Sequence, residues 1–271
     1  MALTNYQRSI CQLLAQSRIA SGESYLAGGG TLNELLAAPR ISRDVDLFHD
    51  TESALDATWQ EDRELLEASG FAMRVIRERA SFVEAAVSRG GEEVLLQWVR
   101  DSAYRFFPLV QHPDLGLTLH PFDLATNKVL ALVGRLEVRD WVDTIECGER
   151  LQPLGYLAWA ACGKDPGFSP LALVEHAART ARYSADEVQM LAFAGSPPDA
   201  GDLSRRWHSQ LASAREIIAA LPAEQAGRCV LDRAGGLVRH PASALTEPFV
   251  SDELRFHSGS IRGVLPQILE R

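Results

Sequence analysis

Lysine is nearly absent from this chain. Of its 27 lysines and arginines, only Lys128 and Lys164 are lysines, so the other 25 cations are arginines. The lysine ammonium is a compact point charge on a flexible stem, and a planar guanidinium does not replace it. In such a composition, the two lysines that remain are candidates for specific roles.

Long apolar runs and paired cysteines are also absent. The longest apolar stretch, LGYLAWAAC at residues 154–162, is far shorter than the roughly 18 residues of a membrane span. The first residues, MALTNYQRSICQLL, show no basic segment followed by an apolar core, so we expect no secretory signal. We therefore expect a cytoplasmic protein with no membrane contact, whose cysteines are buried free thiols: Cys11, Cys147, Cys162 and Cys229.

Positive charge is in deficit as well. The net charge of −9 argues against non-specific wrapping of nucleic acid by the whole surface, although a local basic patch remains possible. The 271 residues suffice for one large domain or two modest ones.

The hydrophobic pattern changes near residue 120. Before it, helices are predicted over 4–18, 31–38 and 52–69, and strands over 24–29, 44–48, 71–78, 81–88 and 92–99, the last two joined by a turn at Gly90 and Gly91. After it, helical patterns run to about residue 220, with Asp123 as the expected N-cap of the first, and a late hairpin follows at 227–240. This order favours an α+β domain at 1–120 joined to a mainly helical domain at 121–271.

Chemistry is concentrated in residues 25–50, YLAGGGTLNELLAAPRISRDVDLFHD. Asp44 and Asp46 alternate along a strand and therefore share one face, where a divalent cation would relieve their repulsion. Magnesium takes one or two protein carboxylates and completes its shell with water and substrate phosphates. Ahead of them, Gly29, Gly30 and Thr31 open a helix whose backbone amides can approach a phosphate closely.

Other phosphate or metal motifs fail on spacing. A dinucleotide-binding G-x-G-x-x-G needs glycine where Asn33 stands, and a P-loop needs serine or threonine where Asp165 stands. A calcium loop starting at Asp44 needs glycine where His49 stands. The remaining alternative is that the aspartates are only the solvated face of an edge strand beside an ordinary glycine turn.

The stretch GGGTLNELL…RISRDVDLF resembles the signature of nucleotidyltransferase-fold proteins of the AbiEii/AbiGii toxin family. The match runs from Gly29 to Phe48 and includes Ser42 and both aspartates. It implies a nucleotidyltransferase-like mixed sheet with helices in the first domain. It also implies that Asp44 and Asp46 are catalytic metal ligands, for Mg²⁺ or Mn²⁺, and that Ser42 binds the nucleotide.

A second block, LHPFDLATNKVLALVGRLEVRDWVD at 119–143, is similar to the family's later motifs. The match implies a catalytic Lys128 that neutralises triphosphate charge, a nucleotide-binding Arg135, and a catalytic Asp140 that orients the lysine or assists the acceptor. On a helix, Lys128 and Arg135 share a face because they are seven residues apart. The alternatives are a solvent-facing lysine and, for Asp140 and Asp143, ordinary salt bridges on the helix surface.

One feature departs from the family pattern. Many nucleotidyltransferases supply a third metal-binding carboxylate from a neighbouring strand. On the strand predicted at 92–99 the central position of that face is Gln97, with Glu93 and Asp101 at its ends. Either Glu93 or Asp101 is the third ligand, or that carboxylate comes from elsewhere in the chain, or it is absent, so a standard two-metal mechanism is in doubt.

The resemblance implies a magnesium-dependent enzyme that transfers a nucleoside monophosphate from an NTP and releases pyrophosphate. Its setting would be that of a toxin with a cognate antitoxin or of phage defence, and its acceptor an RNA such as tRNA. The approach path for RNA would combine Arg135 and Arg139 with Arg100 and Arg105. Two alternatives remain: a non-catalytic relative that binds a nucleotide or a partner protein, and an enzyme for a small hydroxylated molecule.

Overall fold

The computed structural model describes residues 2–266. The chain forms two compact units. The first comprises the chain up to Ala103 together with Leu109–His120, and the second comprises Tyr104–Pro108 and the chain from Pro121 onward. Residues 1 and 267–271, at the outer ends of the two predicted domains, lie outside the described residues.

The first unit is built on a mixed seven-stranded sheet with the strand order β4-β5-β6-β3-β1-β9-β8. Its β3–β6 and β1–β9 pairs are parallel, and its other pairs are antiparallel. The strands of this sheet are β1 (Ser24–Ala27), β3 (Asp44–His49), β4 (Ala72–Arg79), β5 (Phe82–Arg89), β6 (Glu92–Arg100), β8 (Val110–His112) and β9 (Gly116–Thr118). The short strand β2 (Arg40–Ile41) is not part of it. The helices are α1 (Asn5–Ser21), α2 (Gly28–Leu35) and α3 (Glu52–Ala68).

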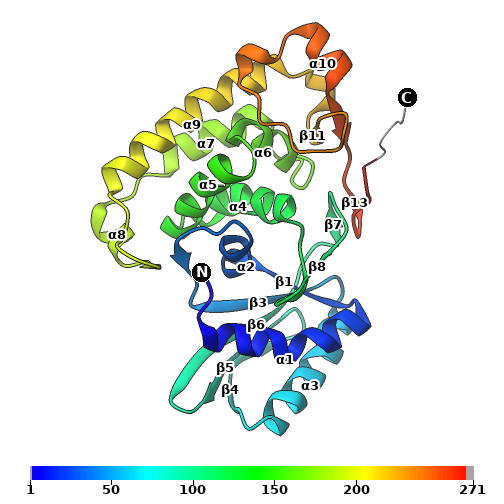
Figure 1. Cartoon of the computed structure of the whole chain (residues 1–271), viewed down its shortest axis with the longest axis vertical. Coiled ribbons are helices and arrows are strands. Elements are labelled where there is room, and N and C mark those ends of the chain that lie inside the picture. Colours follow the sequence, from blue (N-terminus) through cyan, green and yellow to red (C-terminus); the bar gives the residue numbers. More distant parts are fainter. Residues whose placement is uncertain (1, 267–271) are drawn as a thin grey trace. The chain divides into compact units, whose positions relative to one another are not determined.

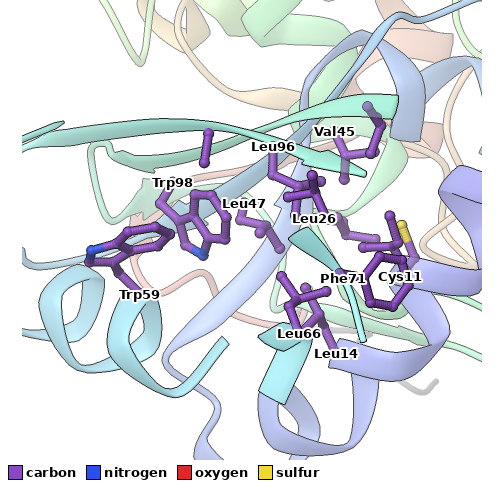
Figure 2. Close-up of a cluster of buried hydrophobic side chains, with 14 of the residues drawn as sticks. Cys11, Leu14, Leu26, Val45, Leu47, Trp59, Leu66, Phe71, Leu96 and Trp98 are labelled. Carbon is purple, nitrogen blue, oxygen red and sulfur yellow. The ribbon is translucent and has the colours of Figure 1, made fainter. Parts of the chain in front are cut away.

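The core of this unit lies on one face of the sheet. Helices α1 and α3 cover that face (Figure 1). Figure 2 shows the apolar side chains between them, including Trp59 of α3 and Trp98 of β6, whose ring centroids are 4.7 Å apart. Every second residue of β3 enters this core, namely Val45 and Leu47. The intervening aspartates therefore point to the opposite face, where α2 begins.

The second unit is mainly helical. Its helices are α4 (Pro121–Arg135), α5 (Val138–Arg150), α6 (Leu154–Ala161), α7 (Pro170–Thr180), α8 (Ala185–Gln189), α9 (Ala200–Ala220) and α10 (Glu247–Glu253), with 3₁₀ turns at Ala223–Gln225 and Ala242–Ala244. Its short strands are β7 (Tyr104–Arg105), β10 (Ala192–Phe193), β11 (Cys229–Leu231), β12 (Arg255–His257) and β13 (Ser260–Ile261).

The predicted late hairpin exists only in outline. Its turn is closed by the bond from the Asp232 amide to the Gly236 carbonyl, and a single bridge joins Leu231 to Leu237. The main partner of β11 is β12, far along the chain. The alternating pattern at 227–240 predicts β11, but β12, the strand that pairs with it, lies outside that segment.

The four cysteines are free and buried, as the sequence predicts. Burial raises the pKa of the Cys11 thiol to about 11 and that of Cys162 to about 12. Among residues 2–266, no helix is long and apolar enough to cross a membrane.

Candidate functional site

Helix α2 begins directly against the carboxylate of Asp46. Strands β1 and β3 pair Ala27 with Asp46, and the next residue, Gly28, has a φ of +71°. A Cβ atom at Gly28 would lie 1.7 Å from Oδ2 of Asp46. Glycine is required here twice, by its left-handed backbone and by the space that the carboxylate occupies.

The aspartate pair lies half-exposed on the face opposite the core. Burial alternates along β3, so Asp44 and Asp46 are partly accessible while Val45 and Leu47 are buried. The hydroxyl of Ser42 donates to Oδ1 of Asp44 at 2.6 Å, which orients that carboxylate. The structure thus brings together three of the predicted residues, Asp44, Asp46 and Ser42.

The remaining predicted residues of the first unit lie in the first turn of α2. Gly29, Gly30 and Thr31 are buried, and a Cβ at Gly30 would lie 3.2 Å from Cβ of Ser42 and 3.4 Å from the carbonyl oxygen of Asp44. The glycines are therefore part of the helix and not a turn ahead of it. The N-cap residue, Ala27, makes no side-chain cap bond and no acidic residue lies in the first turn, so the dipole at the start of α2 favours an anion.

The neighbouring strand places an amide beside the pair. Strand β6 pairs in register with β3, so that Leu95 stands next to Asp44 and Gln97 next to Asp46. The Gln97 amide donates to Oε1 of Glu84 on β5 at 2.8 Å. Sequence analysis missed Glu84, although the two-residue turn at Gly90 and Gly91 fixes its register opposite Gln97.

The two carboxylates considered as a third ligand lie away from the pair. Glu93 is opposite Ser88 and forms an exposed ion pair with Arg74 at 3.8 Å. Asp101 follows the end of β6, where its amide donates to the carbonyl of His49. Within the described part of the chain, no group of three or more His, Cys, Asp or Glu side chains could hold a metal ion. The local donor set is therefore two carboxylates, which fits a magnesium ion that keeps water and substrate oxygens.

The second unit holds a different acidic pair. The Lys128 ammonium lies 2.7 Å from Oδ1 of Asp140 and 3.1 Å from Oδ2 of Asp143, and both aspartates are 0% exposed. The exposed guanidinium of Arg135 adds two bonds to Asp140, at 3.1 and 3.2 Å. Lys128 is therefore not solvent-facing, and both aspartates are buried instead of lying on the helix surface.

The other lysine also ends in a buried ion pair. Lys164 lies 2.8 Å from Oδ1 of Asp123 and donates to Asn127 at 2.8 Å. Asp123 also accepts from the amides of Phe106 and Phe107. The prediction that Asp123 caps α4 is therefore wrong, because the residue lies inside the helix and holds the preceding segment and Lys164.

The predicted basic path for RNA is not formed as proposed. The Arg105 side chain is buried, at 4% exposure, so it is not part of a surface. Arg100 pairs in register with His49, which is buried on the core side of β3. Arg100 therefore lies on the face opposite the aspartates. Phe106 and Phe107, the aromatic residues of the same segment, are buried core residues.

Comparison with known proteins supports the fold. No family model and no curated protein matches the sequence. Among solved structures, the chain is similar to MenT4, a nucleotidyltransferase toxin from Mycobacterium tuberculosis H37Rv, with a TM-score of 0.53 and 15% identity over 81% of this chain and 83% of that one. It is also similar to JHP933 from Helicobacter pylori, with a TM-score of 0.51 and 15% identity over 80% and 95% of the two chains. The chain therefore has a nucleotidyltransferase-like fold, whereas its place in the AbiEii/AbiGii family rests on motif resemblance alone.

Proposed function

We propose that this protein is a magnesium- or manganese-dependent nucleotidyltransferase that moves a nucleoside monophosphate from an NTP to an acceptor. The observation that carries the proposal is the close approach of Gly28 to the half-exposed pair Asp44 and Asp46. A helix start suited to an anion and a carboxylate pair suited to a cation lie side by side, as a metal–triphosphate complex requires.

Each residue of the first unit has a role in this proposal. Asp44 and Asp46 hold the cation, and Ser42 orients Asp44 through its hydroxyl. The first amides of α2, at Gly29, Gly30 and Thr31, bind phosphate oxygens. A divalent ion held by Asp44 and Asp46 would supply positive charge against the negative charge that develops as pyrophosphate leaves.

The lysine cluster has a proposed role of its own. Two buried carboxylates hold the Lys128 ammonium in one place, at 2.7 and 3.1 Å. Asp140 is therefore proposed as a positioning residue for Lys128. That Lys128 neutralises triphosphate charge and that Arg135 contacts the nucleotide remain predictions from the motif resemblance.

The biological setting follows from resemblance. MenT4, which shares the fold, is a nucleotidyltransferase toxin, and the motifs of this chain are similar to those of another toxin family. We propose a toxin-like activity with an RNA acceptor, tRNA first among candidates, and a cognate antitoxin as protein partner.

One observation favours a second candidate function. The position beside Asp46 that could carry a third carboxylate is occupied by Gln97, whose amide donates a hydrogen bond to Glu84. A chain that binds nucleotide without turnover, as a nucleotide- or partner-binding relative of the fold, is consistent with this amide.

One experiment separates these candidates. The protein is incubated with magnesium and labelled NTPs, first with total RNA and then with a panel of small hydroxylated compounds. Pyrophosphate release with label entering RNA is expected. Label entering only small molecules would replace the RNA acceptor, and NTP binding without any release would favour the non-catalytic candidate.

A further inference from the structure

Three arginines lie along β4, the edge strand of the sheet. Strand β4 pairs with β5 so that Arg74 is opposite Ala86, Arg77 is opposite Glu84 and Arg79 is opposite Phe82. The register shifts between Val75 and Arg77, which leaves Ile76 as an extra residue. We call the three side chains the arginine row.

The bulge determines which face carries the row. Neighbouring strand residues point to opposite faces, so Arg74 and Arg77, three apart, would be separated in a regular strand. The extra residue at Ile76 restores them to one face, which is how bulges re-aim side chains. Arg79, two residues further, stays on that face with them.

That face is the one that carries the aspartate pair. The ladders β5–β6 and β6–β3 connect Arg77, Glu84, Gln97 and Asp46 as one row across the sheet. Arg74 and Asp44 end the next row, through Ala86 and Leu95. Three strand spacings separate β4 from β3, about 14 Å in all.

The row is accessible and cationic. Arg74, Arg77 and Arg79 are all exposed, and the guanidinium carbon of Arg77 lies 5.7 Å from the ring centroid of the half-buried Phe82. Within residues 2–266, Arg74 pairs with the exposed Glu93 at 3.8 Å and no ion pair is formed by Arg77 or Arg79. Arg79 also lines a pocket beside α3, so the proposal is based on Arg74 and Arg77.

We propose that the arginine row binds the sugar–phosphate backbone of a single-stranded RNA acceptor whose end reaches the aspartate pair. This inference rests on the proposed transferase function and names the acceptor site. Arg74 and Arg77 are two ladder steps apart, about 6.8 Å, comparable to the spacing of successive phosphates along an extended strand. Guanidinium forks suit phosphate oxygens, and Phe82 offers a ring face on which a base can stack.

An RNA fits this surface better than an acidic protein does. Arg74 and Arg77 share a face with the proposed metal site and are level with Asp44 and Asp46. An RNA strand that follows β4 and then turns across β5 and β6 would bring its end to the aspartates. Glu84 and Glu93 lie on the same face. Their carboxylates would repel an anionic ligand that covers the whole face, so they favour one that follows the arginines. Binding to an acidic polypeptide is therefore an outcome that the test must detect.

The test measures RNA and nucleotide binding separately. A fluorescently labelled single-stranded oligoribonucleotide is titrated with the wild-type chain and with Arg74→Ala/Arg77→Ala over a range of salt concentrations. The loss of two phosphate contacts should weaken binding about tenfold and reduce the salt slope by about 1.4 log units per tenfold rise in salt. The matched control is Arg63→Ala/Arg205→Ala, which removes the same charge at two exposed helical ion pairs.

Each outcome has a defined meaning. Weaker RNA binding in Arg74→Ala/Arg77→Ala, with unchanged magnesium–NTP binding and an unaffected control variant, supports the proposal. Equal losses in both variants, or no loss in either, overturn it while the proposed function stands. Binding of polyglutamate but not RNA through these arginines also overturns it, whereas an absence of magnesium–NTP binding in the wild type contradicts the proposed function itself.

Discussion

Two aspartate pairs, one in each unit, consist of the same side chains and differ in their surroundings. Asp44 and Asp46 alternate on a strand and are half-exposed. Asp140 and Asp143 lie on a helix, are 0% exposed and share the ammonium of Lys128. The first pair is partly accessible and its Asp46 carboxylate lies against Gly28 at the start of α2, whereas the second pair is buried around an ammonium of the protein. An acidic pair thus becomes a candidate metal site through accessibility, not through charge alone.

The largest effect is expected where the compensating cation is removed. In Lys128→Met, the stem volume is kept, but two buried carboxylates lose their shared ammonium. The free energy of unfolding should fall by about 3–5 kcal/mol. Chemical denaturation measures this, and a loss below about 1 kcal/mol would show that the second pair does not depend on Lys128.

Asp62 extends the comparison to a buried carboxylate whose hydrogen-bond donor is neutral. Asp62 is 0% exposed and accepts a hydrogen bond from the Trp98 indole at 2.9 Å. Burial raises its pKa from 3.8 to about 6, against the opposing effects of Arg18 and the indole bond. The folded state therefore binds this proton more tightly than the unfolded chain, so this contribution to stability is complete below about pH 4 and is lost as the pH rises through 6.

The corresponding variant is Asp62→Asn. Between pH 4 and pH 7, Asp62 should lower the free energy of unfolding of the wild type by up to about 3 kcal/mol. Asp62→Asn should remove this loss. Denaturation curves at the two pH values measure the difference. Glu64→Gln, an exposed residue of the same helix, is the control. An identical pH profile in Asp62→Asn would show that Asp62 titrates normally.

The close contact between Gly28 and the Asp46 carboxylate can be disrupted directly. Gly28→Ala places a methyl group on the Asp46 carboxylate and strains a left-handed residue, so stability should fall by about 1–2 kcal/mol and magnesium–NTP binding should be lost. Gly22→Ala has a similar φ of +66° with nothing within 4 Å of the added atom. Isothermal titration with an unreactive NTP analogue compares the two. Equal binding in both variants would mean that the close contact at Gly28 has no role.

The smallest effect is expected at the periphery of the second pair. The Arg135 side chain is 53% exposed, and Lys128 still neutralises Asp140 without it. Arg135→Ala should therefore lower the free energy of unfolding by about 1 kcal/mol or less. A loss as large as that of Lys128→Met would assign the compensation of Asp140 to the arginine instead.

Sequence patterns reveal the first pair more fully than the second. Alternation along Asp44-Val45-Asp46 fixes a shared face, and the glycines ahead of it indicate a close approach, because both are local properties. Helical spacing groups Asp140 with Asp143, but it does not show that Lys128 of another helix closes over them. The bulge at Ile76 is equally hidden, since it appears only when β4 is paired with β5. Non-local packing decides burial, and burial separates a structural ion pair from an open site.

The comparison depends on the proposal that Asp44 and Asp46 hold the metal that accompanies an NTP. Its most direct test is the magnesium dependence of NTP-analogue binding in Asp44→Asn/Asp46→Asn, measured by titration calorimetry on protein shown to be folded by circular dichroism. We expect the variant to stay folded and to lose magnesium-dependent binding. Binding that keeps its wild-type affinity and magnesium dependence would contradict it.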